Sequence, residues 1–120
     1  YDFHSPVAFE LKPNETVTVP TGVRARMNEG WVLTLYPRSD LGFKFRMQLN
    51  NTVGVIDSDY YYSDNEGHIF IKFTNATNEN KTISVSKGDG IAQGIFLPFG
   101  ITEDDSATEK RNGGFGSTGK

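Results

Sequence analysis

The chain has 120 residues, no cysteine and a formal net charge of -3. This length gives room for one domain with a modest core. The lack of cysteine excludes disulfide bonds and thiolate metal ligands and favours a reducing compartment, so we expect a cytoplasmic protein. The negative charge and the lack of a long apolar run give no reason to expect a nucleic acid or a membrane as partner.

Apolar residues recur with a period of two along most of the chain, which is typical of half-buried strands. Turn signals rich in Gly, Pro and Asn separate these segments, and together they predict an all-β sandwich or barrel. One helical turn is expected at residues 40–45, with Ser39 as its N-terminal cap. The expected strands lie at residues 17–19, 23–27, 31–36, 69–73, 83–85 and 91–97.

Residues 51–60 read N-T-V-G-V-I-D-S-D-Y, a short apolar run that ends in two carboxylates. If the strand continues through them, Asp57 and Asp59 share one face, and Ser58 and Tyr60 share the other. This arrangement would place reactive groups at the end of a strand. The simpler alternative is a polar turn after a buried strand, because Asp and Ser are common in turns.

The last part of the chain, residues 103–120, differs in composition from the rest. Its only apolar side chains are Ala107 and Phe115, so it cannot bury enough surface to fold alone. We therefore expect residues 1–102 to form the domain and residues 103–120 to form a flexible arm. Phe115 lies among four glycines with hydroxyl side chains just after it, a set that could cover a base and bind an anion. The arm could close over a nucleotide, whereas an unstructured terminus is the simpler alternative.

Five stretches, in chain order, resemble the five motifs of the trimeric deoxyuridine triphosphatase (dUTPase) family. They are Y-D-F at residues 1–3, P-R-S-D-L-G-F-K at 37–44, N-T-V-G-V-I-D-S-D-Y at 51–60, G-D-G-I-A-Q-G-I-F at 88–96 and R-N-G-G-F-G-S-T-G at 111–119. Residues 61–66 resemble an insertion of bacterial and phage members. The resemblance implies a jelly-roll-like β fold, a β-clip barrel or sandwich, that forms a homotrimer with active sites shared by three chains. It also implies hydrolysis of dUTP to dUMP and pyrophosphate, assisted by Mg²⁺.

The same resemblance implies roles for individual residues. Asp57 matches the carboxylate that activates the attacking water, which needs a base within hydrogen-bond reach. Asn51 matches the amide that reads uracil, because an amide offers both a donor and an acceptor. Tyr60 matches the ring that packs under the deoxyribose, where a 2′-hydroxyl would clash. Asp2 matches an aspartate in the water network near the metal, while Mg²⁺ itself would be held mainly by triphosphate oxygens and water.

The remaining matches surround the phosphates and the base. Phe115 matches the ring that caps uracil. For Arg38 and Gln93, a structural role between subunits is the alternative to direct contact with substrate. The residues that match the phosphate-binding positions are Arg38, Ser39, Gln93, Arg111, Gly116, Ser117 and Thr118.

Two departures from the family pattern affect the phosphate site. Asp40 stands where the family usually has Ser or Gly, and its charge would repel a triphosphate by about 1 kcal/mol per charge pair in water-like surroundings. We therefore expect weakened substrate binding, unless Asp40 faces a partner such as Arg38 or Lys44 or lies at the helix cap. Arg111 lies one residue closer to the following glycines than is common, so either Lys110 or Arg111 could hold the γ-phosphate.

Three other functions stay open on the sequence alone. A dCTP deaminase shares the fold, although the I-D-S-D-Y run and the aromatic, glycine-rich arm favour the triphosphatase. A weakened dUTPase-like protein could bind the nucleotide without turnover or serve as a regulatory surface, and Asp40 favours this alternative. A carbohydrate-binding sandwich could use Tyr60, Tyr61 and Tyr62, but it explains neither the second motif nor the fifth.

Overall fold

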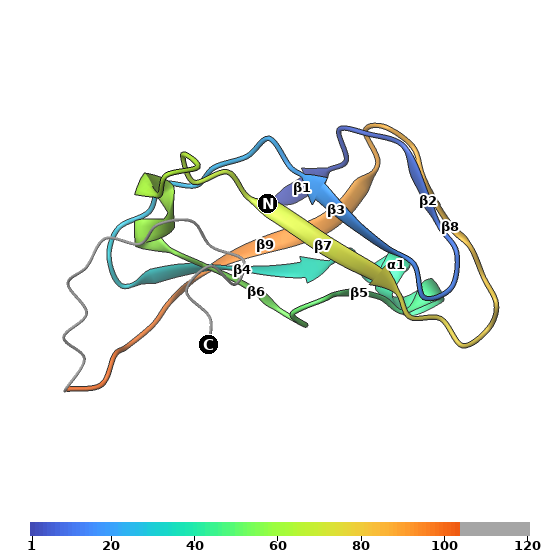
Figure 1. The fold of residues 1–120 in the computed structure, drawn as a ribbon. Coiled ribbons are helices and arrows are strands. Elements are labelled where there is room, and N and C mark those ends of the chain that lie inside the picture. The colour runs from blue at the N-terminus through green and yellow to red at the C-terminus, as the bar shows by residue number, and fades with distance from the viewer. Residues whose placement is uncertain (104–120) are drawn as a thin grey trace.

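The computed structural model describes residues 1–103, and these residues form nine strands, one α-helix and one 3₁₀ helix. Figure 1 shows that most elements are strands and that α1 lies at one end of the molecule. The all-β prediction is therefore confirmed. The elements are β1 (Asp2–His4), β2 (Phe9–Leu11), β3 (Thr16–Pro20), β4 (Trp31–Pro37), α1 (Ser39–Phe45), β5 (Met47–Leu49), β6 (Gly54–Asp57), the 3₁₀ helix η1 (Ser58–Tyr62), β7 (Phe70–Asn75), β8 (Ile83–Val85) and β9 (Gly90–Pro98).

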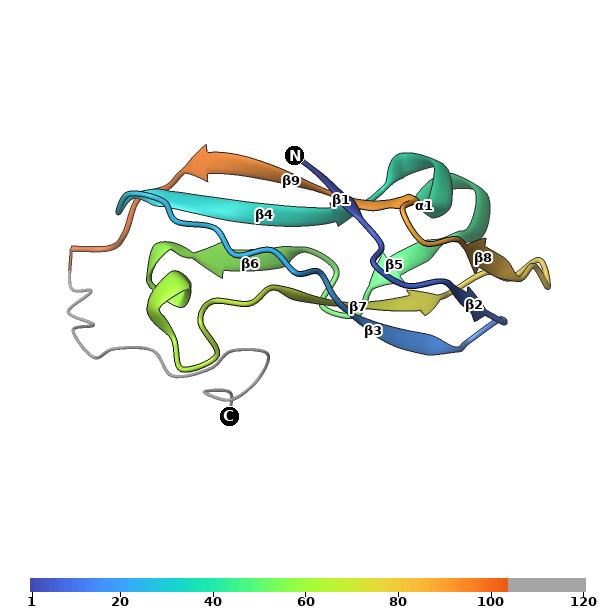
Figure 2. The ribbon, with the colours of Figure 1, turned by 90° about the horizontal axis from the view of Figure 1, so that it is seen from above.

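The strands form three antiparallel sheets. The largest has the order β1-β9-β4-β6, the second has the order β3-β7-β5, and β2 pairs with β8. Seen from above, β9 and β4 run along one side of the molecule while β7 and β3 run along the other (Figure 2). Between these layers lies the hydrophobic core.

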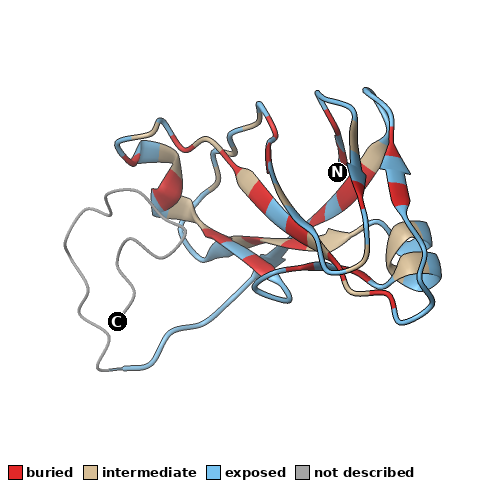
Figure 3. Cartoon of the chain, turned by 45° about the vertical axis from the view of Figure 1, so that its right-hand side comes forward, coloured by how far each residue is buried: buried red, intermediate tan, exposed pale blue. Residues whose placement is uncertain are grey.

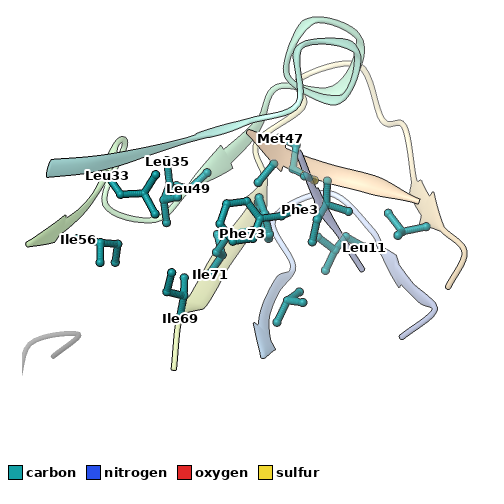
Figure 4. Packing of buried hydrophobic residues seen from close by; sticks show 14 of the residues in the cluster. Phe3, Leu11, Leu33, Leu35, Met47, Leu49, Ile56, Ile69, Ile71 and Phe73 are labelled. Atoms are coloured by element: carbon teal, nitrogen blue, oxygen red, sulfur yellow. The ribbon is translucent and has the colours of Figure 1, made fainter. Parts of the chain in front are cut away.

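Apolar side chains from both layers fill this core. Leu33 and Leu35 of β4 are 2% exposed, and Phe73 of β7 is fully buried. Figure 4 shows these side chains grouped between the ribbons of the two layers. Burial of this set removes a large apolar area from water, which is the main favourable term in folding. The core therefore fixes β4, β6 and β9, and the candidate residues Asp57 and Gln93 lie on β6 and β9.

Buried and exposed positions alternate along the strands, as Figure 3 shows. This alternation follows from the two-residue period of strand side chains. The strands expected at 17–19, 31–36, 69–73, 83–85 and 91–97 correspond to β3, β4, β7, β8 and β9 and are confirmed.

The prediction of a strand at residues 23–27 is wrong. This segment forms no strand, although Val23, Ala25 and Met27 are half-buried and pack against the core. Alternation reports burial of every second side chain, and a segment outside a ladder can meet that requirement too. The carbonyl oxygen of Val23 accepts a hydrogen bond from the backbone N–H of Ile69 at 2.9 Å, which holds the segment beside the chain that leads into β7.

The helix is present as predicted, but its cap is not Ser39. Arg38 occupies the N-cap position and makes no side-chain capping hydrogen bond, and Ser39 is the first helical residue. The backbone N–H of Arg38 donates to the carbonyl oxygen of Ile91 at 3.0 Å, so pairing with β9 extends to the residue just before the helix. Within residues 1–103, no helix is long and apolar enough to span a membrane.

Candidate active site

Asp57 is the last residue of β6 and the residue from which η1 begins. Its backbone is extended, with φ −77° and ψ 161°, and its side chain is half-buried. The next residues turn into the 3₁₀ helix, so strand alternation stops here and Asp59 lies exposed on η1. The expectation that Asp57 and Asp59 share one strand face is therefore wrong. Only Asp57 belongs to the sheet.

Asp57 lies on the outer face of the large sheet. Its neighbour Ile56 is buried, so alternation directs Asp57 to the opposite side. Asp57 is paired with Val32 of β4, which is in turn paired with Leu97 of β9. Directly opposite residues in antiparallel strands share a face, so these three side chains form one row.

The outer face beside Asp57 is apolar and exposed. The adjacent row is formed by Val55, Thr34 and Ile95, which are paired across β6, β4 and β9. Val55 is 54% exposed and Ile95 is 48% exposed. An exposed apolar face of this kind on a folded domain is typical of a protein–protein contact. The carboxylate of Asp57 is thus placed at the margin of a surface that is suited to a second protein.

The first and fourth motifs meet on β1 and β9. The register pairs Asp2 with Gln93, and the Nε2 atom of Gln93 lies 3.5 Å from Oδ1 of Asp2. Both side chains are exposed. Gln93 is also opposite Tyr36 of β4, near the end of the sheet where α1 begins. The structure therefore brings these two predicted site residues together, at a different end of β4 from Asp57.

Arg38 and Asp40 form an ion pair at the start of α1. The Nε atom of Arg38 lies 3.3 Å from Oδ1 of Asp40, and both side chains are about half exposed, at 51% and 50%. Of the partners that the sequence left open for Asp40, Arg38 is the one found. An open depression of about 620 Å³ lies beside the pair, and its lining residues are Ser39, Asp40, Gly42 and Phe43.

Asn51 lies in the tight turn between β5 and β6. The backbone N–H of Thr52 donates to the carbonyl oxygen of Leu49 at 2.9 Å, and that of Val53 donates to the carbonyl oxygen of Asn51 at 2.8 Å. Thr52 has a positive φ of 65°, as a sharp reversal requires. The Asn51 residue is exposed on this turn, so its amide is accessible to a ligand.

Tyr60 differs from the prediction. Tyr60 is only 2% exposed, so its ring belongs to the core and does not lie open beneath a sugar. Its hydroxyl donates to the carbonyl oxygen of His68 and accepts a hydrogen bond from Nδ2 of Asn65 at 2.8 Å. Strand alternation also places Tyr60 on the same face as the buried Ile56, opposite Asp57, so burial of the ring agrees with that pattern and only the expected contact with the sugar is missing.

A polar network around Tyr60 was missed by sequence reasoning. Asn65 also accepts a hydrogen bond from the hydroxyl of Ser63 at 2.8 Å, and Nε2 of His68 accepts one from the backbone N–H of Gly22 at 3.0 Å. These contacts tie the segment after η1 back to the chain after β3. The sequence gives no signal for them, because His68 reads as an ordinary polar residue and its partners are distant along the chain.

Gly67 is required by this network, and its replacement is expected to be costly. Its φ is +72°, and a Cβ atom there would lie 2.6 Å from the backbone Cα of Tyr61. We expect Gly67→Ala to lower the free energy of unfolding by about 3 kcal/mol, because backbone strain adds to a clash that no side chain can relieve. Urea denaturation measures this loss.

Gly30→Ala is the matched control for that substitution. Gly30 also has a positive φ, of +85°, but nothing lies within 4 Å of the added Cβ. It should cost only about 1 kcal/mol, the strain of a left-handed residue. Equal losses for the two variants would contradict the close contact at Gly67.

Asp57 and Arg38 are too far apart to act together within one chain. Asp57 is opposite Val32, and Arg38 follows the same strand, β4, six residues further on. At about 3.3 Å per residue, this places the two backbones roughly 20 Å apart. A carboxylate that activates water and a guanidinium that binds the same triphosphate must lie within a few ångströms of one ligand. The described chain supplies two separate parts of such a site.

The candidate residues of the arm lie outside the described residues. These are Arg111, Phe115, Gly116, Ser117 and Thr118. Among residues 1–103, no group of three or more His, Asp or Glu side chains is placed to hold a metal ion. Mg²⁺ commonly binds through one or two carboxylates together with water and substrate phosphates, so the exposed carboxylate of Asp2 suits an ion that is held mainly by the triphosphate and by water.

Solved structures with the same architecture are dUTPases. The crystal structure of the Streptococcus mutans dUTPase superposes with a TM-score of 0.74 at 41% identity, covering 86% of this chain and 80% of that one. A mutant dUTPase of a Staphylococcus phage, solved with dUpNHpp, superposes with a TM-score of 0.71, covering 91% of this chain and 85% of that one. At 23% identity, the phage protein supports the fold alone. The fold is that of a dUTPase.

Sequence comparison gives the family directly. The dUTPase family profile matches residues 1–119. The chain is 43% identical over 122 residues to the deoxyuridine 5′-triphosphate nucleotidohydrolase of Lactococcus lactis, covering 99% of this chain and 80% of the relative. It is 40% identical to the corresponding protein of Haemophilus influenzae, covering 94% of this chain and 74% of that relative. The chain therefore belongs to the dUTPase family.

Proposed function

We propose that the protein hydrolyses dUTP to dUMP and pyrophosphate with water activated by Asp57. The observation that carries this proposal is the position of Asp57, half-buried at the end of β6 within the motif that matches the family. A carboxylate accepts the proton of the attacking water, the water oxygen bonds to the scissile phosphorus, and the bond to the leaving pyrophosphate breaks. When bound, Mg²⁺ neutralises charge on the triphosphate oxygens.

Binding of the nucleotide is assigned to several motifs. The exposed amide of Asn51 is placed to read the edge of uracil by donating and accepting hydrogen bonds. Arg38, with Ser39 beside it, binds the phosphates, because a guanidinium forms charge-assisted hydrogen bonds with phosphate oxygens. Tyr60 acts indirectly, since its hydroxyl fixes the segment that follows Asp57.

The arm completes the site in this proposal. Residues 103–120 close over the bound nucleotide, with Phe115 capping uracil. The phosphates then receive further donors from Arg111, Gly116, Ser117 and Thr118. The glycines among them would let the backbone approach the phosphates closely.

We propose that the working unit is a homotrimer with shared sites. Two observations support this. Asp57 and Arg38 are roughly 20 Å apart along β4, and the outer face beside Asp57 exposes Val55 and Ile95. A second copy placed on this face would bury the apolar row, and in the proposed trimer a neighbouring copy supplies the Arg38 that acts with Asp57. We also place this protein in the cytoplasm, because its sequence has no cysteine and therefore suits a reducing compartment.

The regulatory alternative has less support than it had from the sequence. Asp40 was the feature that favoured it, but Asp40 is paired with Arg38, so its charge is partly neutralised. The dCTP deaminase alternative is not favoured by the comparisons, which match the dUTPase profile over residues 1–119.

The test is pyrophosphate release from dUTP, UTP, dCTP and dTTP in the presence of Mg²⁺. We expect equimolar dUMP and pyrophosphate from dUTP, with kcat/KM at least about a hundredfold above that for the other nucleotides. Ammonia release from dCTP would instead identify a deaminase. Binding of dUTP without turnover would support the regulatory alternative and contradict the proposal.

A further inference from the structure

The side chain of Arg38 is held from two sides before any nucleotide binds. Its Nε atom is paired with Oδ1 of Asp40 at 3.3 Å. On another side it lies against Gly90, where an added Cβ would be 3.0 Å from Nη1 and 3.4 Å from Cδ of Arg38. Its backbone is fixed as well, because the N–H of Arg38 donates to the carbonyl oxygen of Ile91.

These contacts set the plane of the guanidinium and leave donors for a ligand. The guanidinium carries five N–H groups in a rigid planar fork, so a carboxylate held 3.3 Å from Nε restricts the orientation of the whole group. The Arg38 side chain remains 51% exposed in spite of both contacts. An arginine that is already oriented loses less conformational freedom on binding an anion.

We propose that Asp40 is a positioning residue, which holds the Arg38 guanidinium in the orientation that binds the nucleotide phosphates. Gly90 supplies the room for that orientation. The inference rests on the proposed function, since it takes the phosphates of a deoxynucleoside triphosphate as the ligand of Arg38. It reverses the expectation drawn from charge alone, in which Asp40 only repels the triphosphate.

Two variants of Asp40 separate positioning from repulsion. Asp40→Ala removes the charge and the side-chain oxygens, whereas Asp40→Asn removes the charge but keeps a side chain of the same size with an oxygen beside Nε. We expect Asp40→Ala to weaken binding of dUpNHpp by about fivefold, near the upper end for an exposed ion pair. Asp40→Asn should recover most of that affinity. Tighter binding by both variants would show repulsion and overturn the proposal.

The effect of Asp40 on nucleotide binding must act through Arg38. We expect Asp40→Ala to have no further effect on dUpNHpp binding in an Arg38→Ala background, because residues that act through one group are not additive. Gly90→Ala, which displaces the guanidinium, should weaken binding in wild type and should also be silent in that background. An undiminished effect of Asp40→Ala without Arg38 would overturn the proposal.

A matched surface ion pair controls for general loss of charge. Glu79 and Lys81 are also 3.3 Å apart, and their side chains are 61% and 45% exposed. Glu79→Ala should leave dUpNHpp binding at the wild-type value. Thermal unfolding of both variants shows whether loss of Asp40 from the first turn of α1 changes stability. Equal weakening by Glu79→Ala would mean that charge alone, not orientation, explains the result.

A measurement without nucleotide separates this inference from the proposed function. Relaxation of the Arg38 Nε–H group in ¹⁵N NMR spectra should show a more restricted side chain in the wild type and in Asp40→Asn than in Asp40→Ala. Equal mobility in all three would overturn the positioning role even if dUTP is hydrolysed. Failure of dUTP turnover, with dUpNHpp binding still dependent on Asp40 as described, would overturn the hydrolytic proposal and leave the positioning role in place.

Discussion

Asp57→Asn is expected to lower kcat for dUTP hydrolysis by about two to four orders of magnitude, the usual contribution of a general base. The substitution keeps the size of the side chain but removes its ability to accept a proton from water. Asp57 ends β6 and is paired with Val32 through the sheet, so the fold should be unaffected. Pyrophosphate release measures the rate, and binding of dUpNHpp should stay near the wild-type value.

Asp59→Asn is the control for this loss. Asp59 has the same chemistry and lies two residues away, but it is exposed on η1 and not on the sheet face. Its substitution should change kcat by less than about threefold, which is under 1 kcal/mol. Comparable losses from the two variants would mean that the outer face of the sheet does not define the catalytic carboxylate.

The strands could be predicted because their main signal is local. In β7 and β8, apolar residues at every second position of the sequence match the buried positions, and the turns between strands carry Gly, Pro or Asn. The error at residues 23–27 shows the limit of that signal. Val23, Ala25 and Met27 are half-buried against the core without belonging to a ladder, and only the tertiary arrangement decides whether such a segment pairs as a strand.

The candidate site was predictable where its parts are short motifs. The P-R-S-D stretch predicted a helical turn, which is present, and left Arg38 open as one partner for Asp40, which is the partner found. The hydrogen-bond partners of Tyr60 were not predictable, because His68 and Asn65 follow the turn and no local pattern marks them. Strand alternation assumed that β6 continues past Asp57, and it does not.

The distance between Asp57 and Arg38 leads to the second large effect. Asp57 and Arg38 lie roughly 20 Å apart along β4. Substitution of Asp57 should therefore disable one part of a shared site, and substitution of Arg38 should disable the other part. Asp57→Asn lacks the base and Arg38→Ala lacks a phosphate contact. In a symmetric assembly with head-to-tail contacts, each site takes Asp57 from one copy and Arg38 from a neighbouring copy. Such a site is intact only when the first copy has an unmutated Asp57 and the second has an unmutated Arg38.

Mixed assemblies should therefore regain activity that neither variant has alone. With random mixing of equal amounts, each of the two positions is intact in half of the copies, so roughly a quarter of the sites are complete. Co-expression with two different affinity tags yields such mixtures, and the mass of the purified species gives the number of copies.

Pyrophosphate release by this mixture, compared with the two separate variants, tests the shared site most directly. Our account predicts about a quarter of the wild-type rate at subsaturating dUTP, well above either parent. A rate no higher than the mean of the two parents, in assemblies shown to contain both tags, would contradict a site shared between copies.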